Sequence, residues 1–144
     1  MAGKAKKGSA NKAVLRLVDA NLNRCREGLR VLEDTARFLR RDSHFFHSFR
    51  RERHKMDLLT RRLYPELLAS RDSVQDEGRT LREGGRLNVD ALVFANFRRC
   101  QESLRVLEEY GKLFSPRAGG EFKEMRFTVY RLEKEAQSKW KLKQ

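Results

Sequence analysis

The chain carries a long amphipathic pattern twice, with apolar residues separated by alternating steps of four and three positions. Such steps place the apolar side chains on one face of an α-helix. The first stripe consists of Val18, Leu22, Cys25, Leu29, Leu32, Ala36 and Leu39. The second stripe consists of Val93, Phe97, Cys100, Leu104, Leu107, Gly111 and Phe114. The pattern therefore predicts two long helices with equivalent buried faces.

Two further apolar patterns predict the helices that follow these stripes. One begins after Asp42 or Ser43, either of which suits an N-cap, and Pro65 ends or kinks it. The other follows a helix-breaking segment at 115–120. Asn88 is a suitable N-cap for the third of the four predicted helices. No segment alternates with a period of two, so the predicted fold class is all-α, an antiparallel helical bundle.

The two long helices repeat their polar positions as well as their apolar ones. Residues 17–33 align without gaps with residues 92–108, and 12 of the 17 positions are identical. An internal repeat of this quality predicts two duplicated helical hairpins related by a pseudo-twofold axis. The predicted division of the chain is a flexible basic tail at 1–11 and one helical domain at 12–143, with a first repeat at about 14–63, a long loop at 64–87 and a second repeat at about 88–142.

The repeated polar residues fall into two groups. Asn21 and Arg24 lie on the border of the apolar stripe, about 60° and 120° from its centre, and recur as Asn96 and Arg99. They either bridge helices or line one anion site, and the pattern leaves both interpretations open. The second group favours a solvated ladder of ion pairs three residues apart. It comprises Glu27, Arg30 and Glu33 with their copies Glu102, Arg105 and Glu108.

The charge of the chain widens the range of possible partners. The sequence contains 33 Lys and Arg against 20 Asp and Glu, a formal net charge of +13. That charge suits a nucleic-acid-binding module, a binder of anionic metabolites or simply a soluble surface. We expect neither a secretory signal nor a membrane span, because the longest apolar run, 91–95, is short. The chain is therefore expected to be cytoplasmic, with Cys25 and Cys100 as buried, reduced thiols.

The long loop carries the side chains best suited to chemistry. Arg71, Asp72 and Asp76 lie close to Gly78 on backbone with no helical pattern. Two such carboxylates can hold Mg²⁺, and an arginine can bind a phosphate through two N–H groups. By local pattern alone the same aspartates also fit solvated turns, which are common in loops. The spacings typical of P-loops, zinc sites and catalytic triads are absent from the sequence.

A set of segments together resembles a known family. The set comprises Asp19-Ala-Asn-Leu-Asn-Arg24, the segments 27–34 and 95–112, the loop Arg71-Asp72-x-x-x-Asp76-x-Gly78 and the pair Arg53-His54. These segments resemble the small helical family of monofunctional hydroxymethylpyrimidine phosphate kinases of thiamine biosynthesis, a domain found alone or fused in front of thiamine-phosphate synthase. The chain departs from the family's loop at Ser73 and Arg79, where threonines are usual.

The resemblance implies phosphorylation of hydroxymethylpyrimidine phosphate to its diphosphate, with ATP and Mg²⁺ as cofactors. Asp72 and Asp76 are then expected to bind the metal or to activate the substrate hydroxyl. The arginines are expected to hold phosphate oxygens, and the asparagines to bind the pyrimidine edge or position the arginines. The full set of substrate-binding candidates is Asn21, Arg24, Arg71, Asn96, Arg99, Arg53 and His54.

The expected partners follow from the same resemblance. They are the pyrimidine phosphate substrate, thiamine-phosphate synthase as a functional partner, and a second copy of the chain in a homodimer. Nucleic acid and membranes are not expected partners. Two alternative functions stay open at this point: a non-catalytic accessory domain of thiamine-phosphate synthesis, and a basic helical module that binds nucleic acid.

Overall fold

The chain is helical throughout its regular structure in residues 2–81 and 84–144, which the computed structural model describes. Four long helices occupy this described part: α1 (Ala2–Asp34), α2 (Ser43–Thr60), α4 (Val89–Gly111) and α5 (Pro116–Lys139). Shorter elements connect them: a π-helical turn at Thr35–Leu39, a 3₁₀ turn at Arg61–Leu63, the short helix α3 (Tyr64–Ser70) and a 3₁₀ turn at Glu77–Thr80. The predicted all-α class is confirmed.

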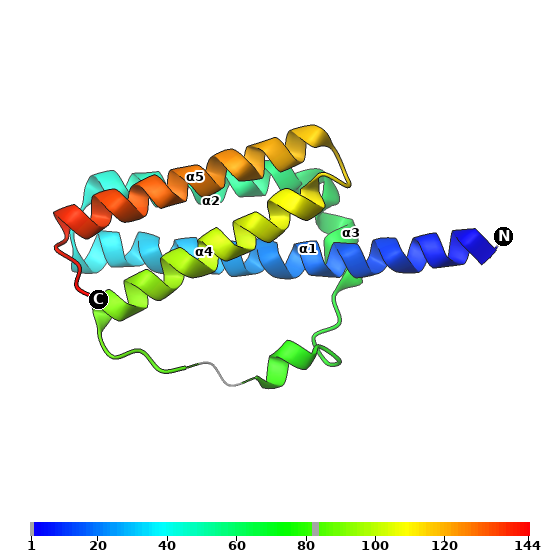
Figure 1. Cartoon of the computed structure of the whole chain (residues 1–144), viewed down its shortest axis with the longest axis horizontal. Coiled ribbons are helices and arrows are strands. Elements are labelled where there is room, and N and C mark those ends of the chain that lie inside the picture. Colours follow the sequence, from blue (N-terminus) through cyan, green and yellow to red (C-terminus); the bar gives the residue numbers. More distant parts are fainter. Residues whose placement is uncertain (1, 82–83) are drawn as a thin grey trace.

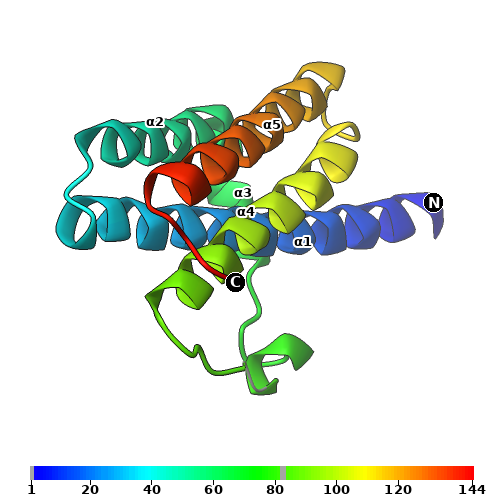
Figure 2. The ribbon, with the colours of Figure 1, turned by 60° about the vertical axis from the view of Figure 1, so that its left-hand side comes forward.

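The long helices form a bundle with two sides (Figure 1). α2 and α5 lie on one side and α1 and α4 on the other, and Figure 2 shows the same order from a second direction. α2 runs back along α1, and α5 runs back along α4. The segments 71–81 and 84–88 lie on the α1 side of the bundle, away from α2 and α5. No helix in the described ranges is long and apolar enough to cross a membrane.

Side-chain caps fix where two of the helices begin, at the residues that the sequence predicts. The Asp42 carboxylate accepts a hydrogen bond from the Phe45 N–H, with an oxygen–nitrogen distance of 3.2 Å. The Asn88 side chain accepts one from the Ala91 N–H at 2.8 Å. Each cap satisfies a backbone donor that the first helical turn leaves without an intrahelical partner.

The observed bounds differ from the prediction in three places. The segment 115–120 is predicted to break the helical pattern, but α5 begins at Pro116, whose missing N–H needs no partner in a first turn. The predicted loop at 64–87 contains the helix α3. The segment 1–11 is predicted as a flexible tail, whereas α1 begins at Ala2. Alanine and lysine are frequent in that segment, and both favour helix.

The core is built from the two predicted stripes and the facing residues of α2 and α5. Cys25 and Cys100 are fully buried and free, as predicted. Leu39 departs from the prediction, since it is 62% exposed. It lies in the π-helical turn, which holds more residues per turn than an α-helix and rotates Leu39 off the stripe. Phe114 is also exposed because α4 ends at Gly111.

The two copies of the sequence repeat meet where α1 packs against α4. The Cys100 thiol points at the backbone carbonyl of Cys25, with a sulfur–oxygen distance of 3.6 Å. Gly28 allows this approach, because a Cβ at that position would lie 2.7 Å from the Cys100 sulfur. Hydrogen bonding to Cys25 and burial raise the pKa of Cys100 well above its ordinary value, so this thiol stays protonated.

The repeat predicts ion pairs three residues apart, and the structure contains Arg30–Glu33 and Arg105–Glu108. The prediction that these glutamates are solvated is wrong. Glu33 and Glu108 are only 2% and 4% exposed. Arg53 donates to Glu33 at 3.1 Å between Nε and Oε2, and Arg126 donates to Glu108 at 2.9 Å between the same atoms. Burial alone would raise the pKa of Glu108, but the hydrogen bond from Arg126 and the charges of Arg126, Arg105 and Lys112 together outweigh it and lower the pKa. Two matching ion pairs suit a duplicated hairpin, which stays a prediction.

The C-terminal residues also join the fold. The Trp140 indole N–H donates to the Asp42 carboxylate at 3.1 Å, and its ring packs edge-on against Phe45 with centroids 4.9 Å apart. Leu142 is buried beside them. Burial alone would raise the pKa of Asp42, but hydrogen bonds from Lys139 and Trp140 lower it. The end of the chain therefore ties the C-terminus of α5 to the start of α2.

Candidate functional site

A cavity of about 680 Å³ lies between α1 and the segment that follows α3. Five of the predicted site residues line it: Asn21, Arg24, Arg71, Asp72 and Asp76. Two come from α1 and three from the long loop, so the fold brings together candidates that lie about fifty positions apart in sequence. A second cavity of about 630 Å³ lies between α2 and α5 and contains none of the predicted residues.

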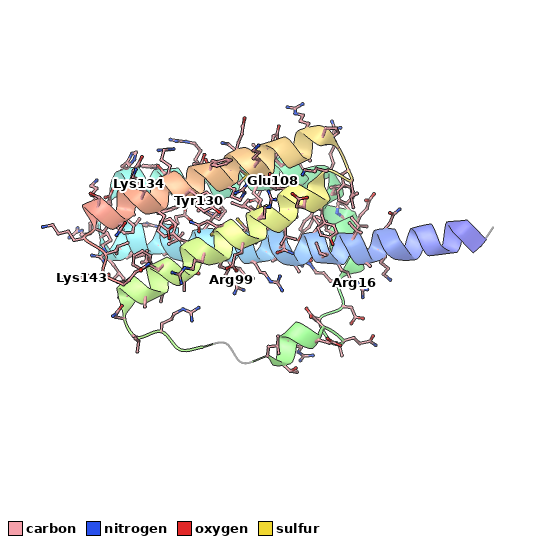
Figure 3. The ribbon with its side chains drawn as sticks, in the orientation of Figure 1. Arg16, Arg99, Glu108, Tyr130, Lys134 and Lys143 are labelled. Carbon is pink, nitrogen blue, oxygen red and sulfur yellow. The ribbon has the colours of Figure 1, made fainter. Side chains whose placement is uncertain are left out.

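The α1 side of the cavity carries two arginines on one stripe of the helix. Arg16 and Arg24 are separated by two turns, which is about 12 Å along the axis. The Asn21 amide donates to the carbonyl of Leu17 at 2.9 Å, and its oxygen faces the Arg24 guanidinium at 3.5 Å. Asn21 is therefore oriented by its own helix and lies beside Arg24. Figure 3 shows Arg16 on the stretch of α1 that faces the loop.

The loop side of the cavity carries the two aspartates in tight turns. The Asp72 carboxylate accepts a hydrogen bond from the Gln75 N–H at 3.2 Å, and the Asp76 carboxylate accepts one from the Gly78 N–H at 2.9 Å. In both cases the accepting atom is Oδ1. Capping by one carboxylate oxygen is compatible with ligand binding by the other, because a carboxylate accepts bonds at both oxygens.

Asp19 is a cavity residue for which the sequence analysis assigns no role. It is 6% exposed and receives a two-point ion pair from Arg71, with Nε–Oδ2 at 2.7 Å and Nη2–Oδ1 at 3.1 Å. The hydrogen bond to Asp19 raises the pKa of Arg71, so the guanidinium stays charged. Asp19 stands at the border of an apolar stripe and opens the first segment of the family resemblance, but no local pattern links it to Arg71.

Two predicted substrate residues of α2 lie outside this cavity. Arg53 is occupied by the ion pair with Glu33, and its side chain is only 17% exposed. His54 is exposed on the surface of α2. Neither residue lines the cavity that holds the loop aspartates.

The second copy of the asparagine–arginine pair also lies outside the cavity. The Asn96 amide donates to the carbonyl of Leu92 at 2.9 Å, which repeats the arrangement of Asn21. Arg99 lies 3.8 Å from the Glu27 carboxylate, and Figure 3 shows it well away from Arg16. The structure thus does not bring the two copies together around one cavity.

The carboxylates that line the cavity suit a metal ion that also binds a substrate phosphate. Among the residues that the structure describes, no three His, Cys, Asp or Glu side chains form a cluster that could hold a metal by themselves. Mg²⁺ usually takes one or two protein carboxylates and completes its shell with water and substrate phosphates. Asp72 and Asp76, on the same cavity wall, fit that pattern.

Comparisons with known proteins place the sequence in a family. The ThiD2 family matches residues 16–135. The thiamine-phosphate synthase of Nostoc punctiforme is 39% identical over 132 residues, which cover 90% of this chain and 37% of the relative. The corresponding enzyme of Synechocystis sp. is 42% identical over 124 residues, covering 84% and 35%. That of Rhodopirellula baltica is 35% identical over 133 residues, covering 90% and 36%.

The extent of these matches limits what they establish. The chain spans little more than a third of the length of these curated relatives. No solved structure matches it. The family match includes α4, the cavity and all the predicted site residues, and extends through most of α5. The chain belongs to the ThiD2 family.

Proposed function

We propose that this protein acts in thiamine biosynthesis and transfers the terminal phosphoryl group of ATP to hydroxymethylpyrimidine phosphate, giving the diphosphate and ADP. Family membership and relatives named thiamine-phosphate synthase support the pathway. The observation that carries the reaction type is the cavity, in which the Arg16 and Arg24 side of α1 faces the loop carboxylates Asp72 and Asp76. Phosphoryl transfer depends mainly on positioning and charge stabilisation, which this arrangement supplies.

The substrate itself decides between the two roles expected for the aspartates. In hydroxymethylpyrimidine phosphate the hydroxyl is already esterified, so the attacking atom is a phosphate oxygen. A phosphate monoester has its second pKa near 6, so that oxygen is largely ionised at neutral pH and needs no general base. A new P–O bond forms at the transferred phosphorus while the bond to the ADP oxygen breaks. We therefore assign Asp72 and Asp76 to metal binding rather than to activation of a hydroxyl.

The arginines of α1 supply charge where the phosphates would lie. Phosphate oxygens bind guanidinium groups in a forked geometry, and Arg24 is oriented for this by Asn21. Mg²⁺, held by Asp72 and Asp76, would neutralise charge that develops between the nucleotide phosphates. The net charge of +13 adds a general attraction for both anionic substrates.

We further propose that the protein is located in the cytoplasm and forms a homodimer.

The direct test is turnover by the purified protein. ATP, Mg²⁺ and hydroxymethylpyrimidine phosphate are incubated with the chain, and phosphorus NMR is used to detect a pyrimidine diphosphate with ADP. We expect the diphosphate to form, and chelation of Mg²⁺ to stop the reaction. Asp72→Asn and Asp76→Asn should each lower kcat/KM by about 100-fold or more. Asp34→Asn, which removes an exposed carboxylate paired with Arg30 far from the cavity, is the matched control.

A second function is favoured by the length of the relatives. Because the chain spans little more than a third of each, it also suits an accessory domain that assists thiamine-phosphate synthase without turnover. That function predicts that calorimetry detects binding of the pyrimidine phosphate or of the synthase, with no diphosphate formed.

For the proposed kinase, full turnover by both aspartate variants, with a normal circular dichroism spectrum, would contradict the assigned metal site.

A further inference from the structure

The ion pair between Asp19 and Arg71 joins the helix α1 to the loop that carries the proposed metal ligands. We propose that Asp19 is a positioning residue that, by holding Arg71, sets the place of Asp72 and Asp76 against the arginines of α1. This inference rests on the proposed function for what the site does. The ion pair between Asp19 and Arg71, called the tether below, can be tested without any turnover.

The first support is the burial and geometry of the pair. Asp19 is 6% exposed, and an isolated carboxylate at that depth would be costly to leave uncompensated. Both of its oxygens are bound by one guanidinium, at 2.7 Å and 3.1 Å. Two parallel bonds fix direction as well as distance, which a single contact does not. Tyr64 also contributes to the raised pKa of Arg71.

The second support is the place of Arg71 in the chain. It is the C-cap of α3, where the backbone leaves the helix in an extended conformation with φ −63° and ψ 137°. Asp72 follows directly and begins the turn that Gln75 closes. Fixing the Arg71 side chain therefore fixes the point from which the loop departs, one residue before its first carboxylate.

The third support is the local character of the other loop contacts. Among the described residues, the hydrogen bonds that residues 72–81 make join atoms no more than three positions apart. Such bonds shape the turns without attaching them to the bundle. The described attachment on this side of the loop is thus the Arg71–Asp19 pair, which spans 52 positions of sequence.

This assignment also changes the expected role of Arg71. Its Nε and Nη2 groups, which form one of the forks that a guanidinium can present, are both directed at Asp19. Phosphate binding then falls to Arg24 and Arg16, which line the same cavity. Arg71 acts through the carboxylates beside it.

The tether is tested by hydrogen exchange followed by mass spectrometry on the full chain. Asp19→Asn, Arg71→Ala and the double variant are compared with the unaltered protein over residues 72–81. We expect exchange about tenfold faster or more in each variant, with the double no faster than the singles. Arg71→Ala alone leaves the buried Asp19 carboxylate without its partner, whereas the double variant leaves no unpaired charge and is therefore the safer one for folding. Unchanged exchange in that variant would overturn the tether.

The control removes a more exposed ion pair elsewhere on α1. Arg26 donates to Asp57 of α2 at 2.9 Å, outside the cavity. Asp57→Asn should leave exchange at 72–81 unchanged. An equal acceleration in this control would show general loosening of the fold and would also overturn the proposal.

Steady-state kinetics then separate positioning from direct phosphate binding. For a positioning role, Asp19→Asn and Arg71→Ala should both lower kcat and raise the Mg²⁺ concentration for half-maximal rate, with little change in KM for the pyrimidine phosphate. If Arg71 binds phosphate directly, Arg71→Ala raises that KM while Asp19→Asn does not, and the assignment fails. Absence of turnover in the unaltered protein would count against the proposed function, while the exchange data would still decide the tether.

Discussion

The contact between Gly28 and Cys100 predicts that an extra methyl group would destabilise the α1–α4 crossing. In the variant Gly28→Ala, the new Cβ would lie 2.7 Å from the Cys100 sulfur and 3.3 Å from the carbonyl oxygen of Asn96. Unstrained carbon contacts lie at about 3.5–4.0 Å, so the sulfur must move by about an ångström. Cys100 is fully buried and Gly28 is buried, and a packed core offers little space for that movement.

The expected change in the free energy of unfolding follows from two opposing effects. Overpacking of a buried site costs about 1–3 kcal/mol. Replacement of glycine by alanine within a helix stabilises it by about 1 kcal/mol. The net expectation is a loss of about 0–2 kcal/mol in the free energy of unfolding for Gly28→Ala. Removal of the sulfur in Gly28→Ala/Cys100→Ala should relieve the clash, so the two substitutions should show a favourable coupling of about 1 kcal/mol or more.

Urea unfolding monitored by far-ultraviolet circular dichroism measures these differences. The control is Gly120→Ala in α5, since a Cβ there meets no atom within 4 Å. The same chemical change in open space should stabilise the protein by about 1 kcal/mol. If Gly28→Ala is as stabilising as Gly120→Ala, or if its effect simply adds to that of Cys100→Ala, the argument from close packing is refuted.

Three further predictions concern stability and pH. The folded pKa of Glu108 is lowered below its unfolded value of about 4.3, so its ion pair stabilises the fold above that pH and is lost on acidification. Glu108→Gln should therefore flatten the fall of unfolding free energy below about pH 5 in urea titrations at several pH values. Trp140→Phe keeps a ring against Phe45 but removes the N–H that binds Asp42, and thermal unfolding should report a loss of about 1.5–3 kcal/mol. Asn88→Ala removes the α4 cap and should cost about 1 kcal/mol by the same assay, whereas Asn88→Asp should not.

Local patterns predict the helices of this protein well because each helix depends on residues near it in sequence. The apolar stripes identify the buried faces, including both cysteines. Asp42 and Asn88 are found as caps because a cap bonds a backbone group three positions away. The exposure of Leu39 could not be predicted, because a π-helical turn is set by how the chain leaves α1 and not by apolar spacing.

The candidate site could be predicted only in part, for a related reason. Asp72 and Asp76 carry a loop pattern that suggests chemistry, and the structure places them beside Arg24. The partner of Arg71 is 52 positions away and has no signal in the local sequence. Glu33 is interpreted as solvated because a helical wheel does not show that the neighbouring helix α2 covers that position with Arg53.

The two copies of the repeated helix differ at positions that separate a role at the cavity from a role in the core. Asp19 and Asn23, which line the cavity, are two of the five positions at which residues 17–33 depart from residues 92–108. Their counterparts are Phe94, which is 8% exposed in the core, and Arg98. At these positions α1 carries an acidic anchor and an amide, whereas α4 carries an apolar ring and an arginine. Two copies of one helix can in this way specialise, one toward ligand chemistry and the other toward packing.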